Sequence, residues 1–266
     1  MKKLFPSPAF AALLLSVLAS ALLNTSCVTT PPIDPALLNP ATNSAIRPEP
    51  RDPKWVQRHE GFVALAKQGG IEVLFLGDSI TDFWRRENNP NQGGGPVWNK
   101  NYAPLHAANF GISADRTQHV LWRMQNGELD GIAPKVVVLM IGTNNTGFEN
   151  DKVTPRNTVP QTIEGVKAVV RGLRTKLPST KVLLLAIFPR GEKPDFPQRL
   201  QVNEINRSLA LLDDGKFVRY LDIGPKFLAA DGTLSKDIMP DFLHPNLHGY
   251  EIWADAMRAP LAELLR

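Results

Sequence analysis

Cysteine is almost absent from this chain of 266 residues: Cys27 is the only one, so no disulfide can form within the molecule. A block of basic residues is absent as well. Of the formal net charge of +4, two charges belong to Lys2 and Lys3, and the rest is dispersed along the chain. So small and scattered an excess gives no reason to expect nucleic acid or an anionic membrane surface as a partner. The sequence also contains no internal repeat.

The apolar run near the N-terminus, residues 10–23, is short for a permanent membrane helix, which needs about 20 apolar residues. Lys2 and Lys3 precede this run, and the small and polar residues 24–26 follow it. This layout is typical of a signal peptide, which we place at residues 1–27. We therefore expect the protein to be exported, either to the periplasm or cell envelope or out of the cell.

Cys27 resembles the lipidated cysteine of bacterial lipoproteins, although Leu23 lies four residues before it rather than three. Two outcomes stay open. A lipid on Cys27 would tether the protein to a membrane surface, whereas cleavage nearby would leave it free. Residues 28–52 are rich in Pro, Asn and Ala and have no apolar period, which predicts a flexible linker.

From Pro53 onward, short apolar runs alternate with helical patterns, which indicates one α/β domain over residues 53–266. Helical spacing is clear from Val159 to Leu177, and a last helix is expected over about residues 247–265. Strands are predicted at residues 71–76, 107–110, 135–141, 182–187 and 217–221. Their continuous apolar character suits strands buried on both faces, as in a parallel sheet covered by helices.

Polar residues follow three of the predicted strands, in the segments Gly77-Asp78-Ser79, Gly111 and Gly142-Thr143-Asn144. In an open parallel sheet the site lies beyond the carboxyl ends of the strands, so these residues should meet at one edge. Asp78 is expected to brace the turn beside Ser79 rather than to act as a second acid.

A serine nucleophile needs a base, and the base needs a third group that orients it. Ser79 can supply the hydroxyl, His244 the base and Asp241 the orienting carboxylate. Gly111 and Asn144 can supply hydrogen-bond donors for an oxyanion. Each residue also has a simpler explanation, such as a helix cap or a tight turn. Their joint occurrence at predicted strand ends favours catalysis.

These segments resemble the SGNH (GDSL) hydrolase family, whose marker residues map onto Ser79 in GDSIT, Gly111 in NFGIS, Asn144 in GTNN and His244 in DFLHP. The resemblance implies a Ser79–His244–Asp241 triad and an oxyanion hole formed by the Ser79 N–H, the Gly111 N–H and the Asn144 amide. It also implies a flavodoxin-like three-layer α/β/α fold with a five-stranded parallel sheet, and a reaction without metal or organic cofactor.

Within the family, residues 109–145 and the segment FPRGEKP look like the catalytic subunits of intracellular platelet-activating-factor acetylhydrolase. Two departures lie near the expected mouth of the site. The loop RRENNPNQGGGP, residues 85–96, is longer than in those subunits, and Ser113-Ala114 stands where they usually have Gly-Gly. The triad therefore carries over better than the substrate preference does.

We expect an ester hydrolase that removes a short acyl group, with acetyl favoured, from a carbohydrate or a phospholipid-like ester. A lysophospholipase- or thioesterase-like lipase and a non-catalytic glycan-binding envelope module are the alternatives.

The α/β-hydrolase elbow Gly-x-Ser-x-Gly is excluded because Thr81 occupies its last position. A metal pair of His244 and His248 is disfavoured by Pro245, and no zinc-type spacing is present. Arg123 is expected to bind a loop carbonyl or carboxylate. The oligomeric state stays open, a dimer included.

Overall fold

The computed structural model describes Met1, residues 33–87, Asn89 and residues 91–266. The chain divides into two units, Met1–Ile33 and Asp34–Arg266, and the second contains all the strands described below. The predicted signal peptide after Met1, and Cys27 with it, lie outside the described residues. Among the described residues, no helix combines the length and the apolar character needed to cross a bilayer.

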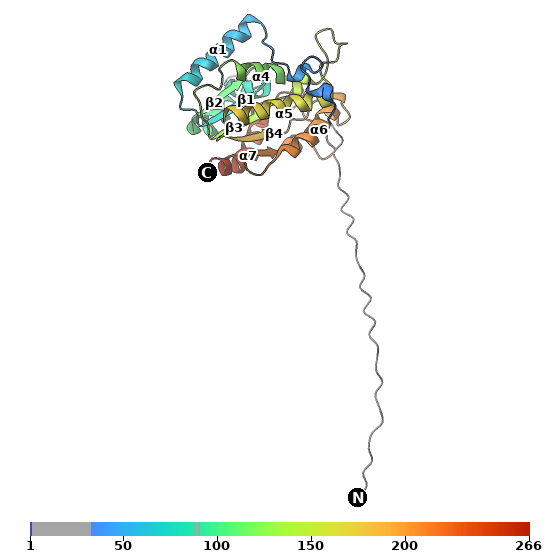
Figure 1. Cartoon of the computed structure of the whole chain (residues 1–266). Coiled ribbons are helices and arrows are strands. Elements are labelled where there is room, and N and C mark those ends of the chain that lie inside the picture. The colour runs from blue at the N-terminus through green and yellow to red at the C-terminus, as the bar shows by residue number, and fades with distance from the viewer. Residues whose placement is uncertain (2–32, 88, 90) are drawn as a thin grey trace. The chain divides into compact units, whose positions relative to one another are not determined.

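A five-stranded parallel sheet in the order β2-β1-β3-β4-β5 forms the middle of the domain (Figure 1). The sheet agrees with the predicted fold class and strand positions. In the register, Gly77 of β1 lies opposite Gly111 of β2 and Met140 of β3, so these three strands end side by side. The strands are β1 (Val73–Gly77), β2 (Ala107–Gly111), β3 (Val136–Met140), β4 (Lys181–Leu185) and β5 (Val218–Leu221).

Helices cover both faces of the sheet and complete a three-layer α/β/α fold (Figure 1). One face is covered by α1 (Pro53–Gln68), α4 (Thr117–Gln125), α5 (Val159–Lys176) and α6 (Pro197–Leu209). The other is covered by α3 (Gly95–Asn101) and α7 (Leu247–Leu264), with the one-turn α2 (Ser79–Asp82) after β1. Short 3₁₀ turns are η1 (Pro35–Leu38), η2 (Ser44–Ile46), η3 (Phe83–Arg85), η4 (Ala103–Leu105), η5 (Thr143–Asn145), η6 (Ala210–Leu212) and η7 (Gly224–Phe227).

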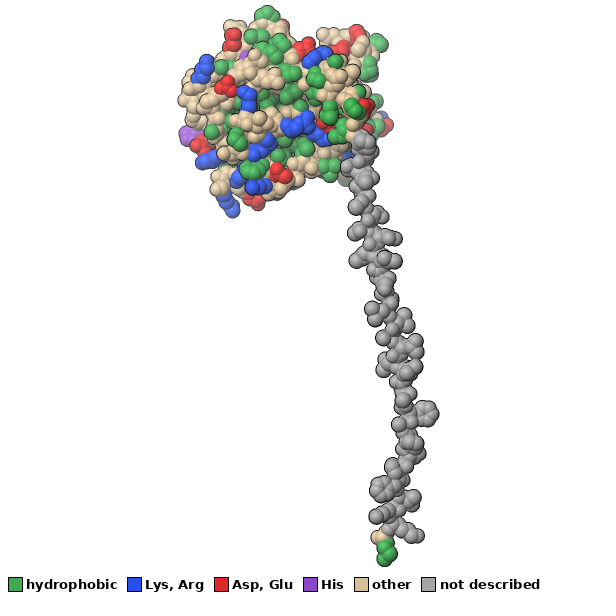
Figure 2. Space-filling model, in the orientation of Figure 1, with side chains coloured by type: hydrophobic (Ala, Val, Ile, Leu, Met, Phe, Trp, Pro, Cys, Tyr) green, Lys and Arg blue, Asp and Glu red, His purple; other side chains and the backbone are tan. Residues whose placement is uncertain are grey.

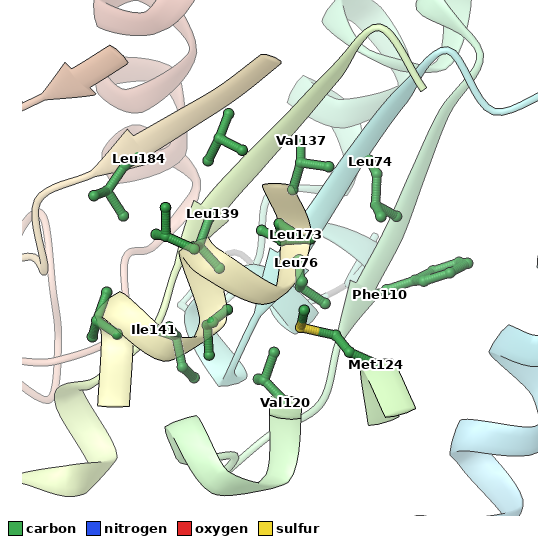
Figure 3. Packing of buried hydrophobic residues seen from close by; sticks show 14 of the residues in the cluster. Leu74, Leu76, Phe110, Val120, Met124, Val137, Leu139, Ile141, Leu173 and Leu184 are labelled. Atoms are coloured by element: carbon green, nitrogen blue, oxygen red, sulfur yellow. The ribbon is translucent and has the colours of Figure 1, made fainter. Parts of the chain in front are cut away.

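Alternate residues of the central strands enter two separate hydrophobic clusters. Leu74 and Leu76 of β1 pack with Val120 of α4 and Leu173 of α5, as Figure 3 shows. Phe75, between those two leucines, belongs to the cluster on the opposite face. Since both faces of β1 are buried, the strand cannot shift without opening a core, and its carboxyl end is a rigid support for a site.

The segment predicted as a flexible linker, residues 28–52, differs from that prediction where it is described. Ala45 of η2 is fully buried against α5, and its carbonyl accepts a hydrogen bond from Thr117 Oγ1 at 2.7 Å. Gly165 leaves the space for it, because a Cβ there would lie 2.9 Å from the Ala45 Cβ. Asn43 caps η2 and bonds the Leu37 carbonyl at 2.8 Å. Polar caps and one small buried residue therefore hold this segment in an ordered conformation, although its sequence has no apolar periodicity.

The face of the domain seen in Figure 2 carries acidic and basic side chains interspersed with apolar ones. This mixture agrees with the dispersed charge of the sequence. No large surface of a single charge sign is visible from this side (Figure 2).

Candidate active site

Ser79 is the first residue of α2, directly beyond the carboxyl end of β1. Asp78 caps this helix, as its Oδ1 atom accepts a hydrogen bond from the Ile80 N–H at 3.0 Å. The bracing role predicted for Asp78 is therefore observed. The turn needs glycine at position 77, because a Cβ there would lie less than 3.0 Å from both Thr81 Oγ1 and the Met140 carbonyl. A strand and a helix thus join so tightly that Ser79 is presented at the sheet edge.

His244 and Asp241 lie on the segment that leads into α7, and the structure brings both to Ser79. The Nε2 atom of His244 lies 2.8 Å from Ser79 Oγ, and its Nδ1 atom lies 2.7 Å from Asp241 Oδ2. Asp241 Oδ1 accepts the backbone N–H groups of Leu243 and His244, at 3.0 and 2.8 Å. Phe242 adopts a left-handed conformation, with φ of 56°. This compact turn fixes the carboxylate against the imidazole that follows it.

The hydrogen bonds define the imidazole tautomer. An ionised carboxylate only accepts hydrogen bonds, so the Nδ1 atom of His244 carries the proton and Nε2 is free to accept the Ser79 hydroxyl. Burial raises the pKa of Asp241, but the hydrogen bonds from the side chain and backbone of His244 outweigh it and hold that pKa below its usual range. Asp241 therefore stays ionised under the conditions in which the imidazole can act as a base.

The Gly111 N–H is not free to act as the oxyanion donor that was expected from the sequence. It donates to Asn109 Oδ1 at 2.9 Å and is already engaged. A Cβ at Gly111 would lie less than 3.0 Å from the backbone N and Cα of Asp82. The structure thus accounts for glycine at this position by the close approach of α2 to β2.

Asn144 lies half-buried in η5, and its Nδ2 atom donates to the Asp115 carbonyl at 3.0 Å. One amide hydrogen remains for a further acceptor. Its neighbour Asn145 is fully buried and bonds the N–H and hydroxyl of Thr117, at 3.0 Å each. Of these two adjacent asparagines, Asn145 joins the loops and Asn144 keeps a free donor.

Ala114 is a residue that the sequence analysis did not single out as a donor. It lies in the same loop as Asp115 and has a left-handed φ of 66°. Within residues 33–87, 89 and 91–266, its N–H has no hydrogen-bond partner, and the same holds for the Ser79 N–H at the start of α2. Two backbone donors are therefore free, one at the start of α2 and one in the loop between β2 and α4.

A buried ionic cluster holds the loop that contains Ala114 and Asp115. Arg123 of α4 is fully buried, lies 3.0 Å from Asp115 Oδ2 and 2.8 Å from Glu128 Oε1, and donates to the Phe110 carbonyl at 2.8 Å. Trp55 Nε1 donates to Asp115 Oδ1 at 2.7 Å. The prediction that Arg123 binds a loop carboxylate is confirmed by Asp115, whereas the carbonyl that it binds belongs to strand β2. Glu128 and Trp55 give no sequence signal, since an isolated Glu and a helical Trp suit a surface and a core equally well.

Asp78 is a buried carboxylate beside the serine. Burial raises its pKa to about 7, the hydrogen bond from Ile80 opposes this rise, and the charge of Asp115 adds to it. No cation pairs with Asp78 directly within the described residues. Its protonation therefore affects stability near neutral pH.

A cavity of about 590 Å³ opens beside Asp241 and Leu243. The segment between β4 and α6 forms its other wall, with four charged side chains and the aromatic ring of Phe196. The charged residues are Arg190, Glu192, Lys193 and Asp195. In the described part of the chain, no three His, Cys, Asp or Glu side chains are grouped so as to hold a metal ion.

The layered parallel sheet and a serine beyond its first strand define a hydrolase of the SGNH type. Residues 75–252 match the GDSL-like Lipase/Acylhydrolase family, and since this match covers more than half of the chain, the protein belongs to that family. It is an acylhydrolase that acts on carboxylic esters.

The chain is 38% identical over 230 residues to platelet-activating factor acetylhydrolase IB subunit alpha1 of Homo sapiens, covering 84% of this chain and 91% of the relative. Its fold is similar to that of an acetyl xylan esterase, with a TM-score of 0.58 and 24% identity over 72% of this chain and 100% of the other. An acetylxylan esterase from Geobacillus stearothermophilus gives a TM-score of 0.56 and 22% identity, covering 74% and 94%.

Proposed function

We propose that this esterase removes a short acyl group, preferably acetyl, from a carbohydrate or phospholipid-like ester through a Ser79–His244–Asp241 triad. The observation that carries the proposal is the unbroken line of hydrogen bonds from Ser79 Oγ through the His244 ring to Asp241 Oδ2, at 2.8 and 2.7 Å. A hydroxyl, an imidazole and a carboxylate in this order are the groups that acyl transfer requires.

In the proposed reaction, Ser79 Oγ attacks the acyl carbon while its proton moves to His244 Nε2. Asp241 stabilises the imidazolium without taking the proton. The tetrahedral intermediate collapses, His244 gives the proton to the leaving alcohol, and an acyl-enzyme ester remains on Ser79. Water then attacks that ester with His244 again as the base. The bond between the acyl carbon and Ser79 Oγ breaks, His244 returns the proton to Ser79 Oγ, and the carboxylic acid leaves.

For the oxyanion hole we propose the Ser79 N–H, the Asn144 amide and the Ala114 N–H, the last in place of Gly111. Support for Ala114 comes from its N–H, which has no partner in the described structure, and from its position directly before Asp115. The carbonyl of Asp115, the residue after Ala114, accepts a hydrogen bond from Asn144 Nδ2. The Asn144 amide therefore contacts the same loop that carries the Ala114 N–H. Each donor of this kind contributes roughly 10²–10³ to kcat.

The cavity beside Asp241 is lined by neither Ser79 nor His244, and it supports a polar alcohol part of the ester. Four charged side chains line it, three of them exposed, and such a lining suits a polar ligand better than a long acyl chain. Sugar hydroxyls can pair with such groups, and the apolar face of a sugar can rest on Phe196 or Phe242, which line the same cavity. The names of the relatives, an acetylhydrolase and acetylxylan esterases, support a short acyl group.

We also propose that the protein works outside the cytoplasm, on the basis of Lys2, Lys3 and the apolar run over residues 10–23. Cys27 would be its membrane attachment if it is lipidated. An exported enzyme would meet acetylated glycans of the envelope or the surroundings more readily than intracellular lipids.

The test is a panel of p-nitrophenyl esters from acetate to palmitate, followed by acetylated xylan and an acetyl-glycerophospholipid. We expect kcat/KM to be highest for acetate and to fall with chain length. A maximum at palmitate would favour the lipase-like alternative. Absence of turnover with every ester, together with no fluorophosphonate labelling of Ser79, would favour a glycan-binding module.

A further inference from the structure

The long loop between α2 and α3 returns to the Asp241 carboxylate. Gln92, in this loop, donates from Nε2 to Asp241 Oδ2 at 2.8 Å. The same oxygen faces His244 Nδ1 at 2.7 Å. A single carboxylate oxygen thus lies between the imidazole and a side-chain amide that comes from a different part of the chain.

We infer that Gln92 is a positioning residue that fixes the Asp241 carboxylate for the His244 imidazole. This inference rests on the proposed function, because it gives Gln92 a role only if His244 works as the base. It assigns a task to the loop RRENNPNQGGGP, which we expect from the sequence to be longer than in the catalytic subunits that the chain resembles.

The orientation of the Gln92 amide follows from its second partner. Arg86 Nη1 donates to Gln92 Oε1 at 3.2 Å, and a guanidinium has donors only. The amide oxygen must therefore face Arg86, and the NH₂ group must face Asp241. The Arg86 guanidinium carbon lies 3.1 Å from the ring centroid of Phe83, and that ring lies 4.8 Å from the His244 ring, centroid to centroid.

These contacts form a closed ring that includes the proposed base and the carboxylate that orients it. Its members, in order, are His244, Asp241, Gln92, Arg86 and Phe83, and the last packs on the first. A ring of this kind restrains both partners at once. The carboxylate cannot rotate away from the imidazole without breaking its hydrogen bond from the Gln92 amide. The imidazole cannot tilt without disturbing Phe83.

The backbone of the loop is fastened on either side of Gln92. The Gln92 N–H donates to the Asn89 carbonyl at 3.2 Å, and the Gly94 N–H donates to the Phe83 carbonyl at 3.1 Å. Glycine is needed at position 94, since a Cβ there would lie 2.6 Å from both the Trp84 and Tyr250 rings. The loop is therefore drawn tightly onto the domain, and the Gln92 side chain is directed at Asp241 by its anchored backbone.

The charged groups near His244 and Asp241 determine how a substitution at Gln92 would change the electrostatics of the site. Arg86 lies on the Gln92 side, and Arg190, Glu192, Lys193 and Asp195 line the cavity that Asp241 shares. Lys236 lies over the Phe242 ring, next to Asp241 in the chain. The amide itself is neutral, so Gln92→Glu would add one negative charge directly against Asp241 and leave these other groups in place.

The effect of that charge has a definite sign. A second carboxylate beside Asp241 stabilises the imidazolium form of His244, and a protonated imidazole cannot accept the Ser79 proton. The acid limb of the kcat/KM profile should therefore move to higher pH in Gln92→Glu, by about one unit for a close charge pair. Gln92→Ala removes the donor without adding charge, and should lower kcat about tenfold, the value of one hydrogen bond to a charged group.

The experiment measures kcat, KM and the pH profile of p-nitrophenyl acetate hydrolysis for wild type, Q92A, Q92E and Q57E. Gln57 is exposed on α1, so Q57E adds the same charge away from the site. Thermal unfolding of each variant separates loss of the fold from loss of positioning. We expect a lower kcat in Q92A, a shifted acid limb in Q92E alone, and a wild-type profile in Q57E.

Wild-type kcat in Q92A, or an unmoved acid limb in folded Q92E, would overturn the inference. If Q92E does not fold, Q92A decides alone through its kcat at unchanged melting temperature. Failure of the proposed function is recognised separately, by substantial esterase activity in Ser79→Ala, which no result at position 92 can produce.

Discussion

The Nε2 atom of His244 lies 2.8 Å from Ser79 Oγ, although 165 residues separate the two along the chain. Ser79 follows the first strand of the sheet and His244 precedes the last helix, so this contact depends on the whole doubly wound fold. The turn at Gly77 and the turn that begins at Asp241 each hold one partner rigidly. A site assembled in this way is pre-organised before the substrate arrives.

Ser79→Ala should lower kcat by a factor on the order of 10⁴ or more, because it removes the atom that forms the acyl-enzyme. The melting temperature should change little, as the hydroxyl has no packing role apart from its bond to His244. The measurement is p-nitrophenyl acetate hydrolysis with circular dichroism as the folding control, and fluorophosphonate labelling should disappear in parallel. Retention of more than a tenth of the wild-type rate would reject Ser79 as the nucleophile.

Asn144→Ala should lower kcat by roughly 10²–10³ if its free amide hydrogen stabilises the oxyanion. KM should change much less, because the donor acts on charge that develops in the transition state. Asn203→Ala is a matched control, since Asn203 lies exposed on α6 and its side chain has no hydrogen bond among the described residues. A change in kcat within twofold for Asn144→Ala would exclude it from the oxyanion hole.

Gly111→Ala should destabilise the domain by about 1–3 kcal/mol, because its Cβ would overlap the backbone at Asp82 and force α2 away from β2. The control is Gly61→Ala in the middle of α1, where a Cβ would meet nothing within 4 Å. That change should stabilise the protein by about 0.5–1 kcal/mol through helix propensity. Chemical denaturation measures both. Equal stability of Gly111→Ala and wild type would show that the close approach is relaxed at no cost.

The sequence alone was sufficient for the sheet and for the place of Ser79 at its edge, whereas the grouping of Ser79 with Asp241 and His244 was expected from the resemblance to the SGNH family. Continuous apolar runs identify strands buried on both faces, and the carboxyl ends of parallel strands must converge. Helix α6 was not predicted, although its buried residues Val202, Ile205 and Leu209 follow one another at intervals of three and four, which is the spacing of an amphipathic helix. The order of the 34–52 segment and the Gln92–Asp241 bond were also missed, since both depend on single contacts between residues that lie far apart in sequence.

Gly111 illustrates a second limit of sequence reasoning. A glycine at a strand end can provide a donor or allow a close approach, and the residue type is the same in both cases. Only the position of Asn109 Oδ1, 2.9 Å from the Gly111 N–H, distinguishes the two. The unengaged donor in that loop belongs to Ala114, a residue type with no sequence signal for such a role.

Asp78→Asn should make the stability of the protein less dependent on pH. The pKa of Asp78 rises to about 7 in the fold because of burial, so between about pH 4 and pH 7 the folded state binds a proton that the unfolded state has lost. Wild-type stability due to this group therefore falls as pH rises through that window and levels off above it. The amide that replaces the carboxyl group does not titrate, and its oxygen can still accept the Ile80 N–H.

The stability difference in favour of Asp78→Asn should thus be larger at pH 8 than at pH 4.5, by up to about 3 kcal/mol for a pKa raised from 3.8 to about 7. Asp52→Asn is the control of opposite sign. The hydrogen bond from the Trp55 N–H holds the pKa of Asp52 below its usual value, so its carboxylate stabilises the fold above that pKa and the amide should cost stability at pH 8. Urea denaturation at the two pH values measures both variants. A pH-independent difference for Asp78→Asn would mean that the folded protein keeps Asp78 ionised throughout, despite its burial beside the nucleophile.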